Sequence, residues 1–190
     1  MVLGSRPLQV FALCGALFHM ANASMLGLVG QKLASQNAGQ GIALTAASAV
    51  AAQAVMVPVA ALAGARADAW GRKPLLLAAF AALALRGALY TFSDDAAWLI
   101  GVQLLDGVGA GLLGALYPVV VADLTRGTNR FNLCMGVFGL ATGIGATLST
   151  AAAGAIEELE ETARLHLLLQ GHRVRHLTPE QVDELRAKFG

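Results

Sequence analysis

Five long runs with few or no charged residues constrain this chain more than any other feature. They cover residues 8–30, 41–63, 74–90, 96–121 and 131–156. Even the shortest approaches the ~20 residues that cross a bilayer at about 1.5 Å per residue. A backbone in lipid must satisfy its own hydrogen bonds, which favours helices. We therefore predict an all-α fold, a polytopic membrane helical bundle with about five transmembrane helices and antiparallel neighbours.

The composition agrees with a membrane protein. Of the 190 residues, 56% are hydrophobic and 13% are charged, whereas soluble domains have about 25% charged residues. A net charge of +1 gives no reason to expect nucleic-acid binding. The first run follows Arg6 and could be mistaken for a signal peptide. It continues uncharged to Gln31, so we interpret it as a retained membrane helix.

Basic residues predict the orientation. The links on one side of the predicted bundle contain most of them, whereas the other side has Lys32 and the acidic pair Asp94-Asp95. The positive-inside rule then places the N-terminus and the link at residues 64–73 in the cytoplasm. We expect an integral protein of the plasma (inner) membrane. We expect Arg86, near the outer end of the third run, to extend outward toward Asp94 or Asp95. The basic residues of the cytoplasmic links are Arg6, Arg66, Arg72, Lys73, Arg126 and Arg130.

A charged stretch, residues 64–73, forms a short predicted turn between the second and third runs. A bare hairpin turn would also favour Gly and basic residues, but it would not fix the spacing of Asp68 from Gly71 and Arg72. The pattern Gly64-x-x-x-Asp68-x-x-Gly71-Arg72-Lys73-x-x-Leu76 resembles the signature loop of the major facilitator superfamily of secondary transporters. The resemblance implies a cytoplasmic gating loop between the second and third helices of a six-helix half.

Asp68 should pair with Arg72, one helical turn further on. By resemblance, Asp68 also lies at the N-terminus of the half's fifth helix, near Arg130, where it holds the cytoplasmic side closed in one state. The alternative for Arg66, Arg72 and Lys73 is contact with anionic lipid headgroups.

The resemblance covers residues 1 to about 156 and points to the C-terminal half, helices seven to eleven. Residues 18–25 and 30–31 are similar to the seventh helix of some members. Many first halves carry an Arg, two residues and Gln-Gly in their fourth helix, but this chain has Gln103-Leu-Leu-Asp106-Gly107. The coupling role of that Arg is therefore not transferred to Gln103.

The remaining residues, 157–190, are predicted to form a polar C-terminal tail distinct from the transmembrane region 1–156. Two short soluble helices are expected, Glu157–Gln170 and Pro179–Lys188, the second with Thr178 as its N-cap. His172 and His176 are four residues apart, but no further ligand is near, so we predict neither a metal nor a cofactor. Cys14 and Cys134 fall inside apolar runs and are expected to be small buried hydrophobes.

Four runs place a polar side chain near mid-membrane: His19, Gln53, Asp106 and Thr142. A central Asp facing lipid would cost about 2.5–3.5 kcal/mol, so we expect these side chains to face protein or a water-filled cavity. Together with Asn22 and Gln103 they are candidates for a substrate or proton path. Asp106 either gains and loses a proton or accepts hydrogen bonds from a neighbouring helix. His19 and Gln53 either line the path or hold helices together. Small residues permit close helix crossing, and the predicted contact positions are Gly107, Gly111, Gly139 and Gly143.

These features predict a transmembrane secondary transporter for a small-molecule solute, with proton coupling as one mode. Such transporters bind substrate between two halves, so five helices would supply one wall. A complementary half or a second copy would supply the other, unless the chain is a truncated product. The alternative is a non-transporting membrane scaffold whose polar tail binds a partner. An enzyme is not expected, since no nucleophile–base arrangement stands out and Gly107–Gly111 lacks the strand context of a dinucleotide site.

Overall fold

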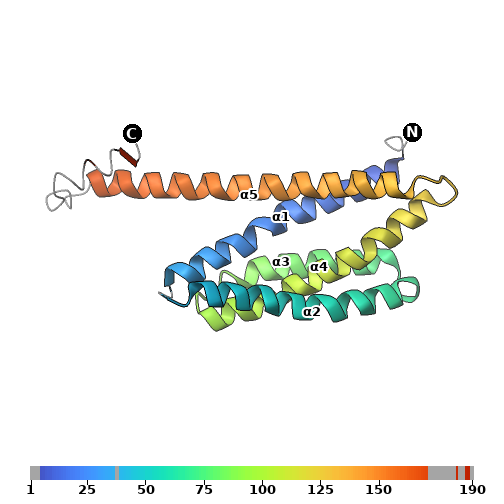
Figure 1. Ribbon diagram of the computed structural model, residues 1–190, viewed down its shortest axis with the longest axis horizontal. Helices are drawn as coiled ribbons and strands as arrows, with labels where there is room; N and C mark the ends of the chain where they lie inside the picture. Colours follow the sequence, from blue (N-terminus) through green and yellow to red (C-terminus); the bar gives the residue numbers. More distant parts are fainter. Residues whose placement is uncertain (1–4, 37–38, 171–182, 184–186, 189–190) are drawn as a thin grey trace. The chain divides into compact units, whose positions relative to one another are not determined.

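The computed structural model describes residues 5–36, 39–170, 183 and 187–188. These residues form helices and no strand, which confirms the predicted all-α class. The chain divides into two compact units, residues 1–149 and 150–190. Figure 1 shows the five helices: α1 (Arg6–Gln36), α2 (Gly41–Trp70), α3 (Arg72–Leu89), α4 (Ala96–Thr125) and α5 (Phe131–Gln170).

Four helices are long and apolar enough to cross a membrane: α1, α2, α4 and residues 131–163 of α5. The sequence predicted five such spans, and α3 is the one that falls short. It has only 18 residues, about 27 Å at 1.5 Å per residue, and it contains three basic residues. Two of them, Arg72 and Lys73, occupy its first turn, where they can remain at the membrane surface.

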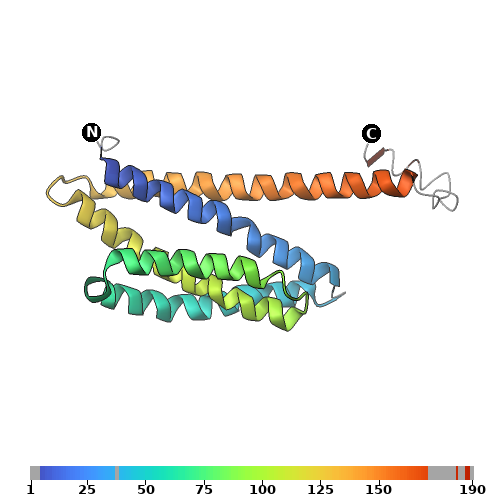
Figure 2. The same ribbon diagram turned by 180° about the vertical axis from the view of Figure 1, so that it is seen from behind.

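The packing of α2 on α4 nevertheless requires α3 to cross. Gly107 of α4 lies against Ala52 of α2, and Gly111 lies against Met56. Residue numbers therefore increase together along the two helices, which run parallel. Since α3 connects them, it must return along the whole bundle, as Figures 1 and 2 show.

The charged stretch 64–73 is not a loop, contrary to the sequence prediction. Residues 64–70 form the last turns of α2, and α3 begins at Arg72. Alternating alanines in this stretch favour helix, so the reversal is confined to Gly71. Its φ of +83° is accessible to glycine at little steric cost.

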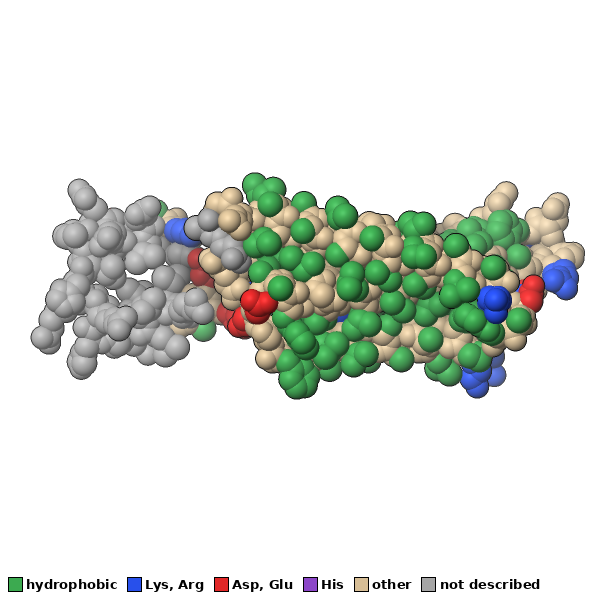
Figure 3. All heavy atoms as spheres, turned by 90° about the horizontal axis from the view of Figure 1, so that it is seen from below, with side chains coloured by type: hydrophobic (Ala, Val, Ile, Leu, Met, Phe, Trp, Pro, Cys, Tyr) green, Lys and Arg blue, Asp and Glu red, His purple; other side chains and the backbone are tan. Residues whose placement is uncertain are grey.

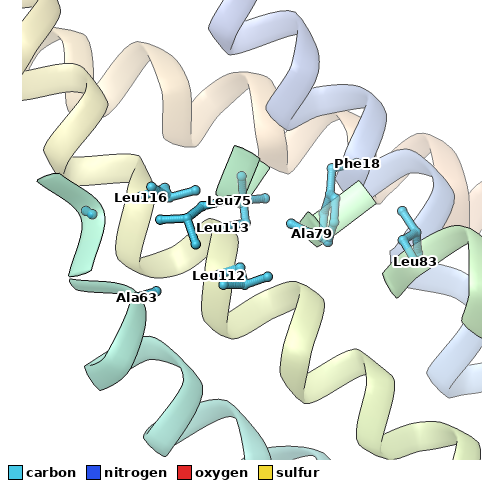
Figure 4. Close-up of a cluster of buried hydrophobic side chains, with 9 residues drawn as sticks. Phe18, Ala63, Leu75, Ala79, Leu83, Leu112, Leu113 and Leu116 are labelled. Carbon is cyan, nitrogen blue, oxygen red and sulfur yellow. The ribbon is translucent and has the colours of Figure 1, made fainter. Parts of the chain in front are cut away.

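A cluster of buried side chains forms the centre of the first unit (Figure 4). Phe18 of α1 packs there against small and aliphatic residues of α2, α3 and α4. On the face shown in Figure 3, hydrophobic side chains form a broad band and charged ones gather toward the ends. This distribution suits a bundle surrounded by lipid. The buried cluster is Phe18, Ala63, Ala67, Leu75, Ala79, Leu83, Leu112, Leu113 and Leu116.

A second buried cluster joins α1, α4 and the first part of α5. The Phe138 ring stacks on Phe11 and on Tyr117, with ring centroids 4.8 and 4.0 Å apart respectively. The Tyr117 hydroxyl donates to the Met135 carbonyl at 2.5 Å, so this polar group has a hydrogen-bond partner within an apolar region. Cys134 is buried in this cluster, and Cys14 is half-buried; both are free thiols.

Glycines mark the closest helix crossings. A Cβ added at Gly107 or Gly111 would clash with backbone carbonyls of α2. Between α1 and α5, a Cβ at Gly145 would clash with the Ala16 backbone, and one at Gly15 would clash with the Phe138 ring. Of the two glycines predicted to make contacts on α5, Gly139 is 3.9 Å from the Tyr117 hydroxyl and Gly143 faces open space. The contact on α5 therefore falls two residues later than the sequence spacing suggested.

The second unit includes the C-terminal part of α5. Residues 157–170 were predicted to form a separate short helix, but in the structure they continue α5 without a break, since no Gly or Pro interrupts them. Lys188 pairs with Glu161 at 3.7 Å. The predicted cap at Thr178 and both His172 and His176 lie outside the described residues. Within the described part of the chain, no group of three or more His, Cys, Asp or Glu residues could hold a metal.

The close α2–α4 crossing predicts a steep cost for one added methyl group. Gly107→Ala should destabilise the bundle by about 1–3 kcal/mol, because the methyl would meet the Ala52 carbonyl oxygen. Gly114→Ala is the matched control on the same helix, where nothing lies within 4 Å. Thermal unfolding in detergent should show a lower midpoint for Gly107→Ala alone. Equal midpoints would contradict this packing.

Candidate functional site

A buried ion pair lies between α3 and α4. Arg86 is 1% exposed, and its Nη1 donates to Oδ1 of Asp106, whose side chain is 18% exposed. The sequence prediction that Arg86 extends outward toward Asp94 or Asp95 was wrong. Asp94 pairs with Lys32 instead, and Asp95 caps α4 by accepting from the Trp98 N–H at 3.1 Å.

The helical period explains why Arg86 points inward. The buried positions of α3 are Leu75, Ala79, Ala82, Leu83 and Arg86, a stripe at three- and four-residue steps. Arg86 belongs to this stripe, so it enters the bundle with the aliphatic residues. This spacing was visible in the sequence and could have revealed the buried position.

Further hydrogen bonds extend the pair into a small polar network. Gln103, fully buried, donates from Nε2 to Oδ2 of Asp106 at 3.2 Å and accepts from the Tyr90 hydroxyl. Arg86 Nη2 donates to the backbone carbonyl of Asn22 at 3.4 Å, and the guanidinium lies 5.7 Å from the Tyr90 ring centroid. We call these five residues the Arg86–Asp106 cluster. It connects α1, α3 and α4.

Three of the predicted path residues, Asn22, Gln103 and Asp106, belong to this cluster. His19 is half-buried one turn before Asn22; it packs edge-on against Phe18 and lies within electrostatic range of Asp106. The other two candidates lie elsewhere. Gln53 is exposed on α2, and the Thr142 hydroxyl donates to the Gly139 carbonyl of its own helix at 2.9 Å.

In this conformation Asp106 accepts a hydrogen bond from a neighbouring helix, one of the two roles that the sequence left open. The partner is an arginine that sequence reasoning had placed at the outer surface. A role for Asp106 in proton transfer stays a prediction.

A second charged cluster surrounds Arg72. Its Nη1 lies 2.6 Å from Oδ1 of Asp68, the pairing that the four-residue spacing predicts, and donates to the Ala67 carbonyl at 3.0 Å. Its Nε donates to Asp123 of α4 at 2.9 Å, and Asp123 also contacts Arg126 at 3.3 Å. We call Asp68, Arg72, Asp123 and Arg126 the Arg72 cluster. Sequence reasoning missed Asp123, which is 51 residues away from Arg72.

The Arg72 cluster offsets an unfavourable arrangement of charges. Asp68 and Asp123 each lie in the last turn of a helix, where the helix dipole disfavours an anion. Arg72 bridges the two carboxylates. Hydrogen bonds to Asp68 and then to Asp123 raise the pKa of Arg72, so its charge is permanent.

The other residues of the signature stretch lie at the surface. Gly64 has open space around it, Lys73 is exposed, and Arg66 packs over the Trp70 ring at 5.7 Å. Asp68 is 93% exposed and its contact here is with Arg72. Its predicted position at the N-terminus of the fifth helix stays a prediction.

The hydrogen bond to Gln103 predicts an effect of Tyr90→Phe. Removing the hydroxyl leaves a fully buried amide oxygen without its donor, at a cost of about 0.5–2 kcal/mol. Unfolding in detergent measures this cost. In a Gln103→Leu background, Tyr90→Phe should add almost nothing; an equal loss in both backgrounds would show that the bond is not the cause.

Comparison with known proteins places this sequence in a family. The profile of the Major Facilitator Superfamily matches residues 10–158. Two proteins of Mycobacterium tuberculosis, from strains CDC 1551 / Oshkosh and H37Rv, are each described as an uncharacterized MFS-type transporter. Each is 57% identical over 150 residues, which cover 79% of this chain and 36% of the relative. No solved structure matches significantly. The chain thus spans about a third of the length of these relatives, and it belongs to the Major Facilitator Superfamily of integral membrane transporters.

Proposed function

We propose that this chain forms one half of a secondary transporter that moves a small-molecule solute across the plasma membrane by alternating access. Family membership supports transport, and the Arg86–Asp106 cluster is the observation that carries the proposal for this chain. Ionisable residues at membrane depth are costly and mark solute or ion pathways. A scaffold would need no such cluster.

The second wall of the pathway comes from another polypeptide in this proposal, either a complementary half or a second copy. Transporters with internal repeats bind substrate near the midplane at the repeat interface. The position of Gln53 supports this arrangement. It is exposed near the middle of α2, where lipid is an unfavourable neighbour and a facing helix or a watery cavity is a favourable one.

We propose the C-terminal half of the family's architecture for these helices, with the N-terminus in the cytoplasm. The basic residues of the Arg72 cluster and of the α4–α5 link support this orientation through the positive-inside rule. The Arg72 cluster then lies at the cytoplasmic end, where it ties α2 and α3 to α4.

The test is reconstitution. Liposomes would contain the chain alone, or the chain together with a polypeptide carrying the remaining two thirds of a M. tuberculosis relative. Uptake of a library of labelled solutes would be measured with and without a pH gradient. We expect uptake only when both polypeptides are present. Stable association without uptake of any solute would contradict transport and favour a scaffold.

The Arg72 cluster predicts a specific effect of Asp68→Asn. In the assembled transporter this variant should insert normally and transport several-fold more slowly, since Arg72 loses one of its two carboxylate partners. The matched control is Arg66→Gln, which removes a charge from the same turn of α2 but leaves the Arg72 cluster complete. Unchanged uptake in Asp68→Asn would rule out a gating role for this carboxylate.

A further inference from the structure

We propose that this chain binds one anionic phospholipid, with the phosphate between Arg126 and Arg130 and one acyl chain in an apolar groove between α1 and α5. The inference goes beyond the proposed function, because it concerns the surrounding membrane and requires no solute. Two hollows that follow one another along α5 carry it, one basic and one apolar.

The basic hollow lies at the link between α4 and α5 and has a volume of about 710 Å³. Arg126 and Arg130 line it, together with Asn129 and Asn132. Guanidinium groups bind phosphate through paired hydrogen bonds, and side-chain amides supply further donors. The hollow also lies at the start of α5, where the helix dipole favours an anion. We call it the Arg130 hollow.

The two arginines of the Arg130 hollow differ from Arg72, whose charge is balanced within the chain. Arg126 contacts Asp123 at 3.3 Å, but its side chain is 85% exposed. Asp123 is itself held by Arg72 at 2.9 Å. Arg130 is exposed, and among the described residues no ion pair involves it. The hollow therefore has positive charge available to an anion from outside the chain.

The apolar hollow is a groove of about 360 Å³ between α1 and the first part of α5. The small side chains of Ala12, Ala16 and Ala141 leave space that larger residues would fill. Leu13 and Ile144 also line the groove and are exposed. It is therefore open at the surface of the bundle, where lipid is the surrounding medium. We call it the α1–α5 groove.

The groove continues from the hollow along one face of α5. Leu133 lines the Arg130 hollow, whereas Val137, Ala141 and Ile144 line the groove. These four residues recur at steps of three and four, so they share one face of the helix. A molecule whose anionic group lies in the hollow can therefore extend directly into the groove.

The direction of α1 places the start of the groove at the same end of the bundle. Phe11 stacks on Phe138, and the Ser149 hydroxyl donates to the Ser24 hydroxyl at 3.1 Å. Residue numbers therefore increase together along the two helices, which run in the same direction (Figure 2). Leu8, the first residue of α1 in the groove, thus lies toward the end where α5 begins.

The dimensions of the groove favour an acyl chain over a helix. At 1.5 Å per residue it extends about 12 Å from Leu8 to Ala16, so its volume of about 360 Å³ gives a mean cross-section of about 30 Å². An α-helix with its side chains has a cross-section of about 80–110 Å². A partner helix would lie on the rim, whereas a hydrocarbon chain enters the groove. Basic pockets between membrane helices bind anionic headgroups, and a phospholipid supplies headgroup and chain together.

Native mass spectrometry of the purified chain tests the proposal. The chain would be mixed with phosphatidylglycerol or with phosphatidylcholine of the same acyl chains, which differ in net charge. We expect one phosphatidylglycerol to remain bound, with an occupancy several-fold above that of phosphatidylcholine. Occupancy should fall several-fold when the acyl chains of phosphatidylglycerol are shortened, and inorganic phosphate should not displace the lipid.

Two pairs of variants separate the contributions of the hollow and the groove. Arg130→Gln should lower phosphatidylglycerol occupancy several-fold, whereas Lys73→Gln, which removes an exposed charge at the same end of the bundle, should not. Ala141→Leu fills the groove and should weaken binding of long-chain phosphatidylglycerol several-fold. Its control is Ala21→Leu, the same change at an exposed position of α1, which should leave binding unchanged.

Equal occupancy by the two lipids in the native chain would overturn the proposal, and so would full retention of phosphatidylglycerol in Arg130→Gln. Displacement by inorganic phosphate would also overturn it, since the hollow would then take a free anion. Unchanged binding in Ala141→Leu would show that no acyl chain occupies the groove. The lipid comparison in the native chain needs no variant, so it decides even if a variant does not fold. None of these measurements involves transport.

Discussion

The structure of this bundle depends on the buried ion pair between Arg86 and Asp106. Parallel packing of α2 and α4 obliges α3 to cross the membrane as well, although α3 is the one of the five helices that is not long and apolar enough to count as a candidate span. Two of its basic residues lie at its first turn, but Arg86 is in its interior. A carboxylate supplied from α4 at the same level balances the charge of an arginine that is buried inside the bundle. The pair is thus a condition for the topology as well as a candidate element of function.

Packing elsewhere follows from the absence of a hydrophobic driving force between helices in lipid. Helices instead approach closely where glycine removes a side chain, at Gly107 and Gly111 on α4 and at Gly145 on α5. Salt bridges connect the helices at both ends of the bundle. At one end they belong to the Arg72 cluster, and at the other end Lys32 pairs with Asp94. Close contacts and paired charges, rather than apolar area, therefore define the arrangement of α1 to α4.

Local features were predictable because they depend on near neighbours in the chain. The apolar runs predicted the helices, and the four-residue spacing predicted the Asp68–Arg72 pair. The helix ends were less predictable. The alanines of the charged stretch 64–73 favour helix, so α2 continues to Trp70 instead of ending before the stretch. No helix-breaking residue follows Gly154 within α5, so the helix continued into the polar segment that begins at Glu157.

Pairings between distant residues were not predictable in the same way. Asp123 meets Arg72 only because α4 packs beside α3. The direction of Arg86 was misjudged because two aspartates lay close in sequence, whereas the period of the buried stripe pointed to the interior. Gln103 and Asp106 were expected at a functional position. Their partners Arg86 and Tyr90 lie in α3 and just after its end. Which residues of this segment face α4 depends on tertiary packing, which the sequence does not show.

The central claim is that α3 crosses the membrane with its arginine neutralised inside. Single cysteines at the two ends of α3 test it most directly, in a chain whose native cysteines have been replaced. Lys73→Cys reports one end, and Phe92→Cys, where the native side chain is 75% exposed, reports the other. In intact cells an impermeant maleimide should label position 92 and should reach position 73 only after permeabilisation. Labelling of both positions from the same side would contradict the account.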